Sequence, residues 1–224
     1  MGVKGRLRAD RGPLERQART ILREAGRSLL RLERSSGPAV AAAAEAVIAS
    51  LEGGGTVYLC GNGGSAADAQ HLACELAGRF LLERPSLAAV ALTTNTSSIT
   101  AIGNDYAFEQ VYSRQLEGLG VPGDVLVAIS TSGKSPNVLR AVQTAHRLGM
   151  TVIGMTGAKG KGFAARCDLA LVTPSVSTPH IQEGHIAMGH ALCELVERAL
   201  FSSGARGGKR GSSRAARPRR ARRP

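Results

Sequence analysis

The amino-acid sequence predicts an α/β fold built on a five-stranded parallel sheet flanked by helices. Two observations predict it: five short apolar runs recur along the chain, and helical segments separate them. Each run is continuously apolar rather than alternating, which is typical of a strand buried on both faces. Strands that alternate with helices form a doubly wound parallel sheet, and such a sheet binds ligands at the carboxyl ends of its strands.

The N-terminal segment predicts two helices ahead of the sheet, together spanning about residues 13–52. Over residues 13–34 apolar side chains recur with the helical period, and arginines fill the opposite face. The sequence SSGP at 35–38 should end this helix, because proline removes a backbone donor. An Ala-rich helix follows at 39–51 and is stopped by three glycines.

The remaining elements alternate along the chain. The five predicted strands are residues 56–60, 87–93, 124–131, 150–156 and 168–173. Helices are expected at residues 65–82, 107–119, 135–148 and 179–201. The ligand site should therefore be sought in the loops that follow the strands.

The net charge of +12 is confined to the two ends of the chain. Residues 206–224 carry nine Lys and Arg and no acid, residues 1–38 carry a net +6, and residues 39–205 carry a net −3. We therefore expect a single domain at 1–203 and a disordered basic tail at 204–224, which has too little apolar surface to fold. The tail could contact nucleic acid non-specifically, whereas the acidic body does not suggest a nucleic-acid binder.

The sequence predicts a cytoplasmic protein with reduced cysteines. No apolar run approaches the roughly 18 residues needed to cross a bilayer, and the basic N-terminus has no apolar segment of a signal peptide behind it. Four scattered cysteines lie among apolar neighbours and form no C-x-x-C pair, so buried thiols are expected: Cys60, Cys74, Cys167 and Cys193.

Two of the predicted strands end in small polar loops that open the next helix. These loops read GNGGSAA at 61–67 and STSGKSPN at 130–137. Hydroxyls and free backbone N–H groups at a helix N-terminus favour phosphate, although either loop alone could be an ordinary helix cap. Neither loop matches G-x-x-x-x-G-K-[ST] or G-x-G-x-x-G, so a phosphorylated ligand smaller than a nucleotide fits better.

Four sequence blocks occur in order: GNGGSAADAQHLACELAGRF at 61–80, AIGNDYAFEQVYSRQ at 101–115, AISTSGKSPNV at 128–138 and IQEGHIAMGH at 181–190. Together they resemble the sedoheptulose 7-phosphate isomerases, or phosphoheptose isomerases, of the sugar isomerase (SIS) family. The resemblance covers about residues 10–201. It implies a flavodoxin-like three-layer fold, a homotetramer with the N-terminal helices in its packing, and conversion of sedoheptulose 7-phosphate to D-glycero-D-manno-heptose 7-phosphate.

Moving a carbonyl between neighbouring carbons requires a base, an enediol intermediate and an acid, and one carboxylate and one imidazole suffice. Glu75 lies four residues after His71 and shares its helix face, while Gln182 and His190 lie about 80° apart around the last helix. The resemblance implies that Glu75 is the base and His190 the acid.

The resemblance also implies a metal site. In family members that bind zinc, the ligands match His71, Glu75, Gln182 and His190. Two imidazole nitrogens and two oxygens make a plausible zinc set, and the metal would polarise the substrate carbonyl. We expect one zinc per subunit, although the same groups can act as acid and base without metal.

Substrate contacts implied by the resemblance involve small, hydroxyl and amide side chains. They are Asn62, Gly63, Gly64, Glu75, Asn104, Asp105, Ser130, Thr131, Ser132, Ser135 and Gln182. The Ser and Thr hydroxyls should hold the phosphate, and Asn104 and Asp105 can bond sugar hydroxyls. A simple turn is the alternative interpretation of Asn104-Asp105, since this dipeptide follows a glycine.

The sequence assigns no single role to several further histidines and arginines. His146 is expected to be structural or solvated, and Arg79 and Arg84 could serve either phosphate or subunit contacts. His185 belongs to the last motif but is not one of the implied ligands. His180 stands where the family commonly carries Arg, so a permanent cation is replaced by one that titrates near neutral pH.

A non-catalytic scaffold is the rival interpretation. Some proteins of this fold assist the replication initiator on DNA and replace the residues that match Glu75 and His190 with groups that cannot shuttle a proton. This chain retains both residues, which favours the isomerase. A phosphosugar-binding protein is a further alternative.

Overall fold

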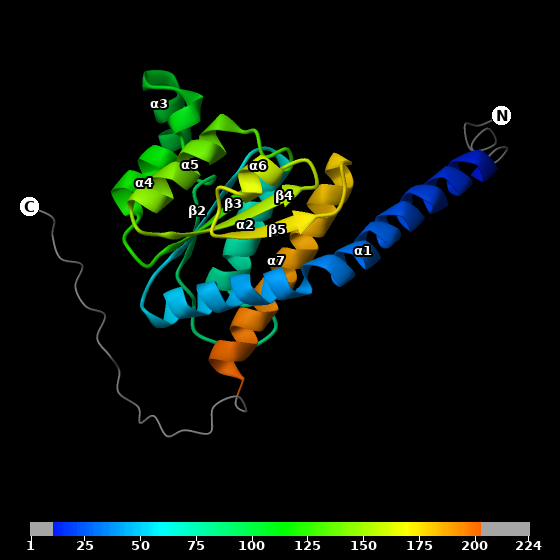
Figure 1. The fold of residues 1–224 in the computed structure, drawn as a ribbon, viewed down its shortest axis with the longest axis horizontal. Helices are drawn as coiled ribbons and strands as arrows, with labels where there is room; N and C mark the ends of the chain where they lie inside the picture. The colour runs from blue at the N-terminus through cyan, green and yellow to red at the C-terminus, as the bar shows by residue number, and fades with distance from the viewer. Residues whose placement is uncertain (1–10, 203–224) are drawn as a thin grey trace, which may run out of the picture.

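A five-stranded parallel sheet forms the centre of the molecule (Figure 1), as predicted. This computed structural model describes residues 11–202, so the basic tail at 204–224 lies outside the described residues. The strands are β1 (Val57–Gly61), β2 (Ala89–Ala91), β3 (Val125–Ile129), β4 (Thr151–Gly157) and β5 (Leu169–Thr173). Their order is β2-β1-β3-β4-β5, the flavodoxin-like order. Leu59 of β1 pairs with Ala91 of β2 and Val127 of β3.

Helices cover both faces of the sheet and account for its continuously apolar strands. The helices are α1 (Arg11–Glu52), α2 (Gly64–Ala77), α3 (Thr96–Asp105), α4 (Ser113–Leu119), α5 (Pro136–Arg147), α6 (Lys161–Ala164) and α7 (Thr178–Phe201), with a 3₁₀ turn, η2, at Phe108–Gln110. Val57 and Leu59 face the core under α1, α2 and α7. Tyr58 and Cys60 face the core that includes Val142 of α5. These alternating directions produce three layers.

The N-terminal segment forms one continuous helix, so the predicted break at 35–38 is wrong. Pro38 lies inside α1, and the helix changes direction near the middle of its length (Figure 1). A proline inside a helix removes one hydrogen bond and bends the helix without ending it when packing continues on both sides. Leu32 and Val40, which flank the proline, are both buried in the core shared with α7. Tertiary packing therefore outweighs the local helix-breaking signal.

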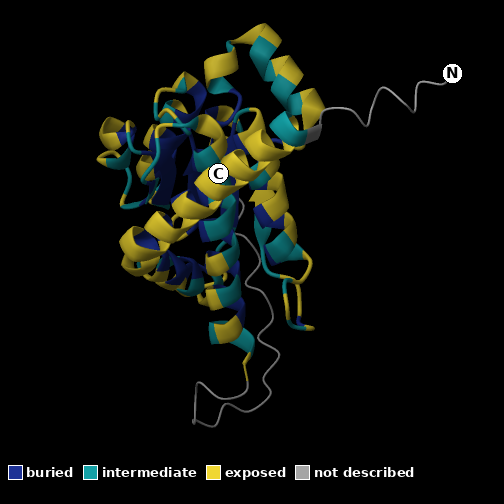
Figure 2. Cartoon of the chain, turned by 90° about the vertical axis from the view of Figure 1, so that its right-hand side faces the viewer, coloured by how far each residue is buried: buried dark blue, intermediate teal, exposed yellow. Residues whose placement is uncertain are grey.

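The first turns of α1 extend beyond the body (Figure 1), and most of their residues are exposed (Figure 2). The exposed side chains include large apolar residues, among them Leu14, Ile21, Leu22 and Leu30. None of the described helices is long and apolar enough to cross a membrane.

Other helix predictions also differ from the structure. The single helix predicted at 107–119 is divided into η2 and α4. The helix predicted at 65–82 ends at Ala77, because Gly78 follows and the next residues form an ordered loop. Residues 96–105 form a helix, α3, that the apolar pattern did not predict. Asn95 caps it by accepting a hydrogen bond from the Ser98 amide at 2.9 Å.

The cysteine prediction is only partly confirmed. Cys60 and Cys193 are buried, Cys167 is half-buried, and Cys74 is exposed; all four are free thiols. Cys74 lies on the solvent face of α2, while its neighbour Ala73 turns toward the core. Adjacent residues of a helix point in different directions, so apolar neighbours in the sequence do not show that a cysteine side chain is buried.

Candidate active site

Two parallel helices, α2 and α7, bring together three of the predicted site residues. The Nε2 atoms of His71 and His190 lie 2.8 Å apart, and His71 Nε2 lies 3.3 Å from Oε1 of Glu75. The three donor atoms all lie within 4.8 Å of one another. Gly189 permits this close packing, since a Cβ atom there would lie 2.6 Å from Leu72 of α2. A carboxylate and two imidazoles thus share one partly exposed site.

The donor set fits zinc. Zinc in proteins takes imidazole nitrogen and carboxylate oxygen at about 2.0–2.2 Å, commonly from four ligands, and His71, Glu75 and His190 supply three such atoms in one cluster. The predicted fourth ligand, Gln182, lies two turns before His190 on α7. Its amide packs against Gly64 at the start of α2, where a Cβ atom would collide with it.

The loop after β1 is fixed by residues that sequence reasoning missed. Asn62 exchanges two 2.8 Å hydrogen bonds with the side chain of Asn137, which is 1% exposed. The Tyr112 hydroxyl donates to the carbonyl oxygen of Gly61, and burial raises the pKa of this hydroxyl above its usual value. Gly63 has φ +56°, a conformation that favours glycine. Asn137 follows Pro136 within the sequence block at 128–138, and its place in that block is the sequence feature that could have indicated its role.

The loop after β3 gathers the predicted phosphate contacts. Ser130 and Ser135 hydroxyls lie 3.1 Å apart, and the Gly133 amide donates to Ser130 Oγ at 3.1 Å. The Lys134 amide donates to Ser132 Oγ at 3.2 Å. The loop leads directly into α5, so hydroxyls and helix N–H groups face the same region. An anion could replace these internal hydrogen bonds.

The structure does not bring Asn104 and Asp105 to the Glu75–His190 cluster. Both are exposed in the last turn of α3, so the alternative interpretation as a simple turn is wrong. The Asn104 amide donates to Asp105 Oδ1 at 2.8 Å. Among the described residues, no hydrogen bond or ion pair joins this pair to α2 or α7.

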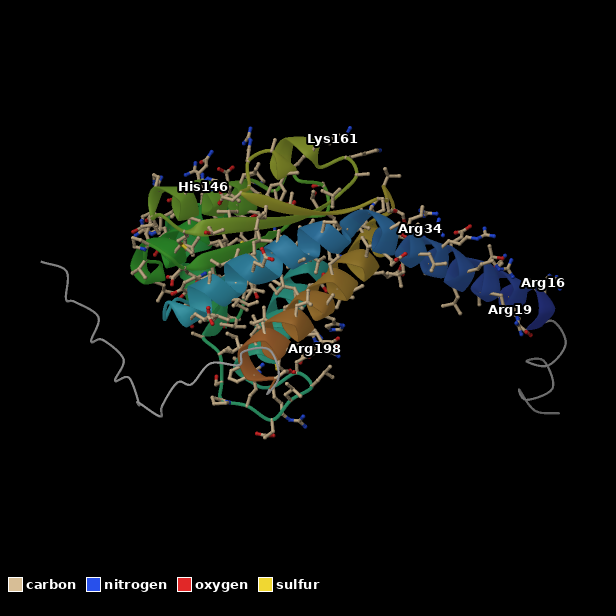
Figure 3. All side chains as sticks on the ribbon, turned by 60° about the horizontal axis from the view of Figure 1, so that its bottom comes forward. Arg16, Arg19, Arg34, His146, Lys161 and Arg198 are labelled. Carbon is tan, nitrogen blue, oxygen red and sulfur yellow. The ribbon has the colours of Figure 1, made fainter. Side chains whose placement is uncertain are left out.

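The other histidines lie in three different environments. His146 is on α5, away from α7 (Figure 3), with Nε2 3.3 Å from Asp168 Oδ2. His180 Nδ1 lies 2.9 Å from Glu183 Oε2. His185 is fully buried, and burial lowers its pKa to about 4, although the neighbouring backbone of Thr156 partly opposes this shift. His185 is therefore neutral near pH 7.

The two arginines that follow α2 have separate roles. Arg79 is exposed, 3.8 Å from Glu83. Arg84 is buried and forms a 2.8 Å ion pair with Glu197 of α7, so it is not available to a substrate phosphate.

Comparison with known proteins shows the family to which the chain belongs. A model of the SIS domain family matches residues 22–157. Over 189 residues the chain is 56% identical to the phosphoheptose isomerase of Rhodospirillum rubrum, covering 84% of this chain and 100% of that protein. The solved phosphoheptose isomerase of Neisseria gonorrhoeae is 45% identical with a TM-score of 0.78, covering 82% of this chain and 98% of that one. That of Francisella tularensis is 38% identical with the same TM-score, covering 81% and 97%. The chain therefore belongs to the phosphoheptose isomerases of the SIS domain family.

Proposed function

We propose that this chain is an aldose–ketose isomerase that converts sedoheptulose 7-phosphate to D-glycero-D-manno-heptose 7-phosphate. The observation that carries the proposal is the meeting of Glu75 and His190 beside His71, in a chain 56% identical to a phosphoheptose isomerase along that protein's whole length. A carboxylate and an imidazole in one open site are the two groups that an enediol mechanism needs.

In the proposed mechanism, Glu75 and His190 divide the two proton transfers. The Glu75 carboxylate removes a proton from C1 of the ketose, and O2 takes up a proton, which together form the enediol. His190 then delivers a proton to C2 while the C1 hydroxyl gives up its proton, so the carbonyl moves from C2 to C1. The proton lost from O1 balances the one gained by O2, and proton exchange with water returns Glu75 and His190 to their starting states. Glu75 is half-buried, with 21% of its side chain exposed, so substrate can reach it while much of the water is excluded.

We propose that His71, Glu75 and His190 also hold a zinc ion, with Gln182 as the fourth ligand. When bound, the metal would polarise the substrate carbonyl as a Lewis acid. Support comes from the clustering of two imidazole nitrogens and a carboxylate oxygen.

The phosphate of the substrate is proposed to bind at the loop after β3, through Ser130, Thr131, Ser132 and Ser135. The N-terminus of α5 adds partial positive charge at that point. We propose that Asn62, Gly63 and Gly64 approach the substrate from the loop after β1. Asn104 and Asp105 stay the proposed contacts to sugar hydroxyls.

We further propose that the protein is a homotetramer in the cytoplasm, with α1 in the subunit packing. Exposed apolar residues on α1 support this, together with a hollow of about 580 Å³ between α1 and α7 that is lined by Leu29, Leu32, Val40, Met188 and Leu195, among others. Light scattering should give a tetramer mass, and a monomer mass would refute the proposal.

Turnover of sedoheptulose 7-phosphate by the purified protein tests the proposed activity. Formation of the aldose product is expected. An intact tetramer without detectable product would instead support the non-catalytic scaffold. The presence of both proton-transfer groups in one cluster speaks against that alternative.

A further inference from the structure

A buried ion pair links α7 to the loop that follows α2. Glu197 Oε1 accepts a hydrogen bond from Nε of Arg84 at 2.8 Å, and each side chain is only 1% exposed. Charged groups are seldom buried this deeply, and they stay charged only where other groups compensate for the lost water. The further contacts of the two side chains show what this pair holds in place.

The Glu197 carboxylate binds three consecutive backbone amides of the loop. The amides of Phe80, Leu81 and Leu82 donate to its two oxygens at 3.0, 2.7 and 2.9 Å. Burial alone would raise the Glu197 pKa, but these amides and the Arg84 side chain outweigh it, so the pKa lies below its usual value. The carboxylate is therefore charged at neutral pH.

The Arg84 guanidinium binds backbone carbonyls at the end of α2. Nη2 donates to the carbonyl oxygen of Glu75 at 2.8 Å, and Nη1 donates to that of Leu76 at 2.9 Å. Nη1 also lies 3.3 Å from the carbonyl oxygen of Gly78. The last carbonyls of a helix have no partner within the helix, and here a buried cation satisfies them. The residue that carries the proposed catalytic carboxylate is thus held through its own backbone.

The same loop reaches the proposed catalytic acid. The ring of Phe80, whose amide binds Glu197, lies 5.6 Å between centroids from the ring of His190. His190 precedes Glu197 by two turns on α7. Helix α7 therefore carries His190 directly and holds Phe80 through the hydrogen bond between the Phe80 amide and Glu197. A shift of the loop would therefore move Phe80 and the end of α2 together relative to His190.

We propose that Glu197 and Arg84 are a positioning pair, which holds Glu75 on α2 and Phe80 in the loop at fixed places relative to His190. This inference rests on the proposed isomerisation. Among the described residues, neither side chain contacts the loop after β1 or the loop after β3, where the substrate phosphate is proposed to bind. The pair should therefore affect the proton transfers rather than substrate binding.

The test compares two buried carboxylates. Glu197→Gln keeps the size of the side chain but removes the charge and one acceptor. Asp124→Asn is the matched control, since Asp124 is also 1% exposed and accepts from the amides of Thr56 and Val121 at 2.7 and 2.9 Å. Asp124 precedes β3 at the amino edge of the sheet, away from the site. Both variants are assayed with sedoheptulose 7-phosphate at a temperature where circular dichroism shows them folded.

Glu197→Gln should lower kcat by at least about 10-fold with KM within about threefold, whereas Asp124→Asn should keep kcat within about twofold. Hydrogen exchange adds a measurement that does not depend on activity. The amides of residues 80–82 should exchange faster in Glu197→Gln than in the unsubstituted protein, whereas Asp124→Asn should leave their exchange rates unchanged. Equal kcat in the two variants, or a loss that appears in KM alone, would overturn the positioning role.

Arg84→Lys gives a second route if Glu197→Gln does not fold. Lysine keeps the charge beside Glu197 but lacks the planar guanidinium that reaches several carbonyls at once, so the same loss of kcat is expected. A kcat equal to that of the unsubstituted protein would contradict the proposal. If the unsubstituted protein itself produced no aldose, the proposed activity would fail, and the exchange data would still report whether the pair orders the loop.

Discussion

The Nε2 atoms of His71 and His190 lie 2.8 Å apart, although the two residues are 119 positions apart in the sequence. At this distance the two nitrogens cannot both carry a proton; one ring donates to the other, or both direct lone pairs at a shared cation. Glu75 lies 3.3 Å from His71 and adds a carboxylate to the same place. The contact between α2 and α7 thus creates the chemistry that neither helix holds alone.

Zinc content tests the cation alternative. The purified protein should contain about one zinc per chain, and His71→Ala should lose it because only two of the clustered donors remain. His146→Ala is the matched control, since His146 lies on α5 outside the cluster (Figure 3). Elemental analysis that finds no zinc in an active, chelator-free preparation would remove the metal and leave the acid–base mechanism in place.

The close approach of Gly64 to Gln182 should be essential to the site. A Cβ atom at position 64 would collide with the Gln182 amide, so Gly64→Ala should displace that side chain and lower kcat/KM by roughly 10-fold. Gly118→Ala in α4 is the control, because nothing lies within 4 Å of a Cβ there and alanine favours the helix. Equal kcat/KM for Gly64→Ala and the unsubstituted protein would show that activity does not require Gln182 in its present place beside Gly64.

Buried His185 should make the protein less stable in mild acid. Its pKa is about 4 in the folded chain and near 6.5 when unfolded, so between these values the unfolded chain binds more protons. Stability should therefore fall as the pH drops through this window, by about 3 kcal/mol in total. Thermal unfolding measured between pH 7 and 4 should show this loss, and His185→Leu should show less of it. An unchanged pH dependence in the variant would contradict the assignment.

The sequence predicted the elements that repeat a simple pattern. All five strands are found within a few residues of their predicted positions. In β1, β3 and β4, burial on both faces leaves a continuous apolar run. The break at 35–38 failed for the opposite reason: the proline signal is local, whereas Leu32 and Val40 hold α1 together by packing on distant elements. The apolar pattern did not predict helix α3, because its polar and β-branched residues carry no helical apolar stripe.

The candidate site also contains some features that the sequence predicted and others that it did not. Three residues that the sequence blocks proposed as ligands, His71, Glu75 and His190, lie in one cluster, whereas Asn104 and Asp105 lie apart from it. The partners that hold these groups were not predictable. Asn137 fixes Asn62 from 75 residues away, and Glu197 binds the Phe80 amide from 117 residues away. No local spacing encodes contacts of that kind; they follow from the packing of the whole domain.

Deletion of residues 206–224 should leave isomerisation unchanged within about twofold. This segment carries nine basic residues and no acid, and its charge should cause salt-sensitive retention on DNA that the truncated protein loses. Turnover and DNA retention measured at low and physiological salt check both expectations. Loss of activity on truncation would show that the tail contributes to a site.

The proton-transfer pair is the central claim, and turnover by Glu75→Gln tests it most directly. Glutamine keeps the shape of the side chain but cannot accept a proton, so kcat for sedoheptulose 7-phosphate should fall by roughly 10²–10⁴-fold. Binding of the sugar phosphate, measured by calorimetry, should stay within about threefold, and Glu117→Gln, at a partly exposed ion pair between α4 and α5, should retain normal kcat. A near-normal kcat for Glu75→Gln would contradict the assignment of Glu75 as the base.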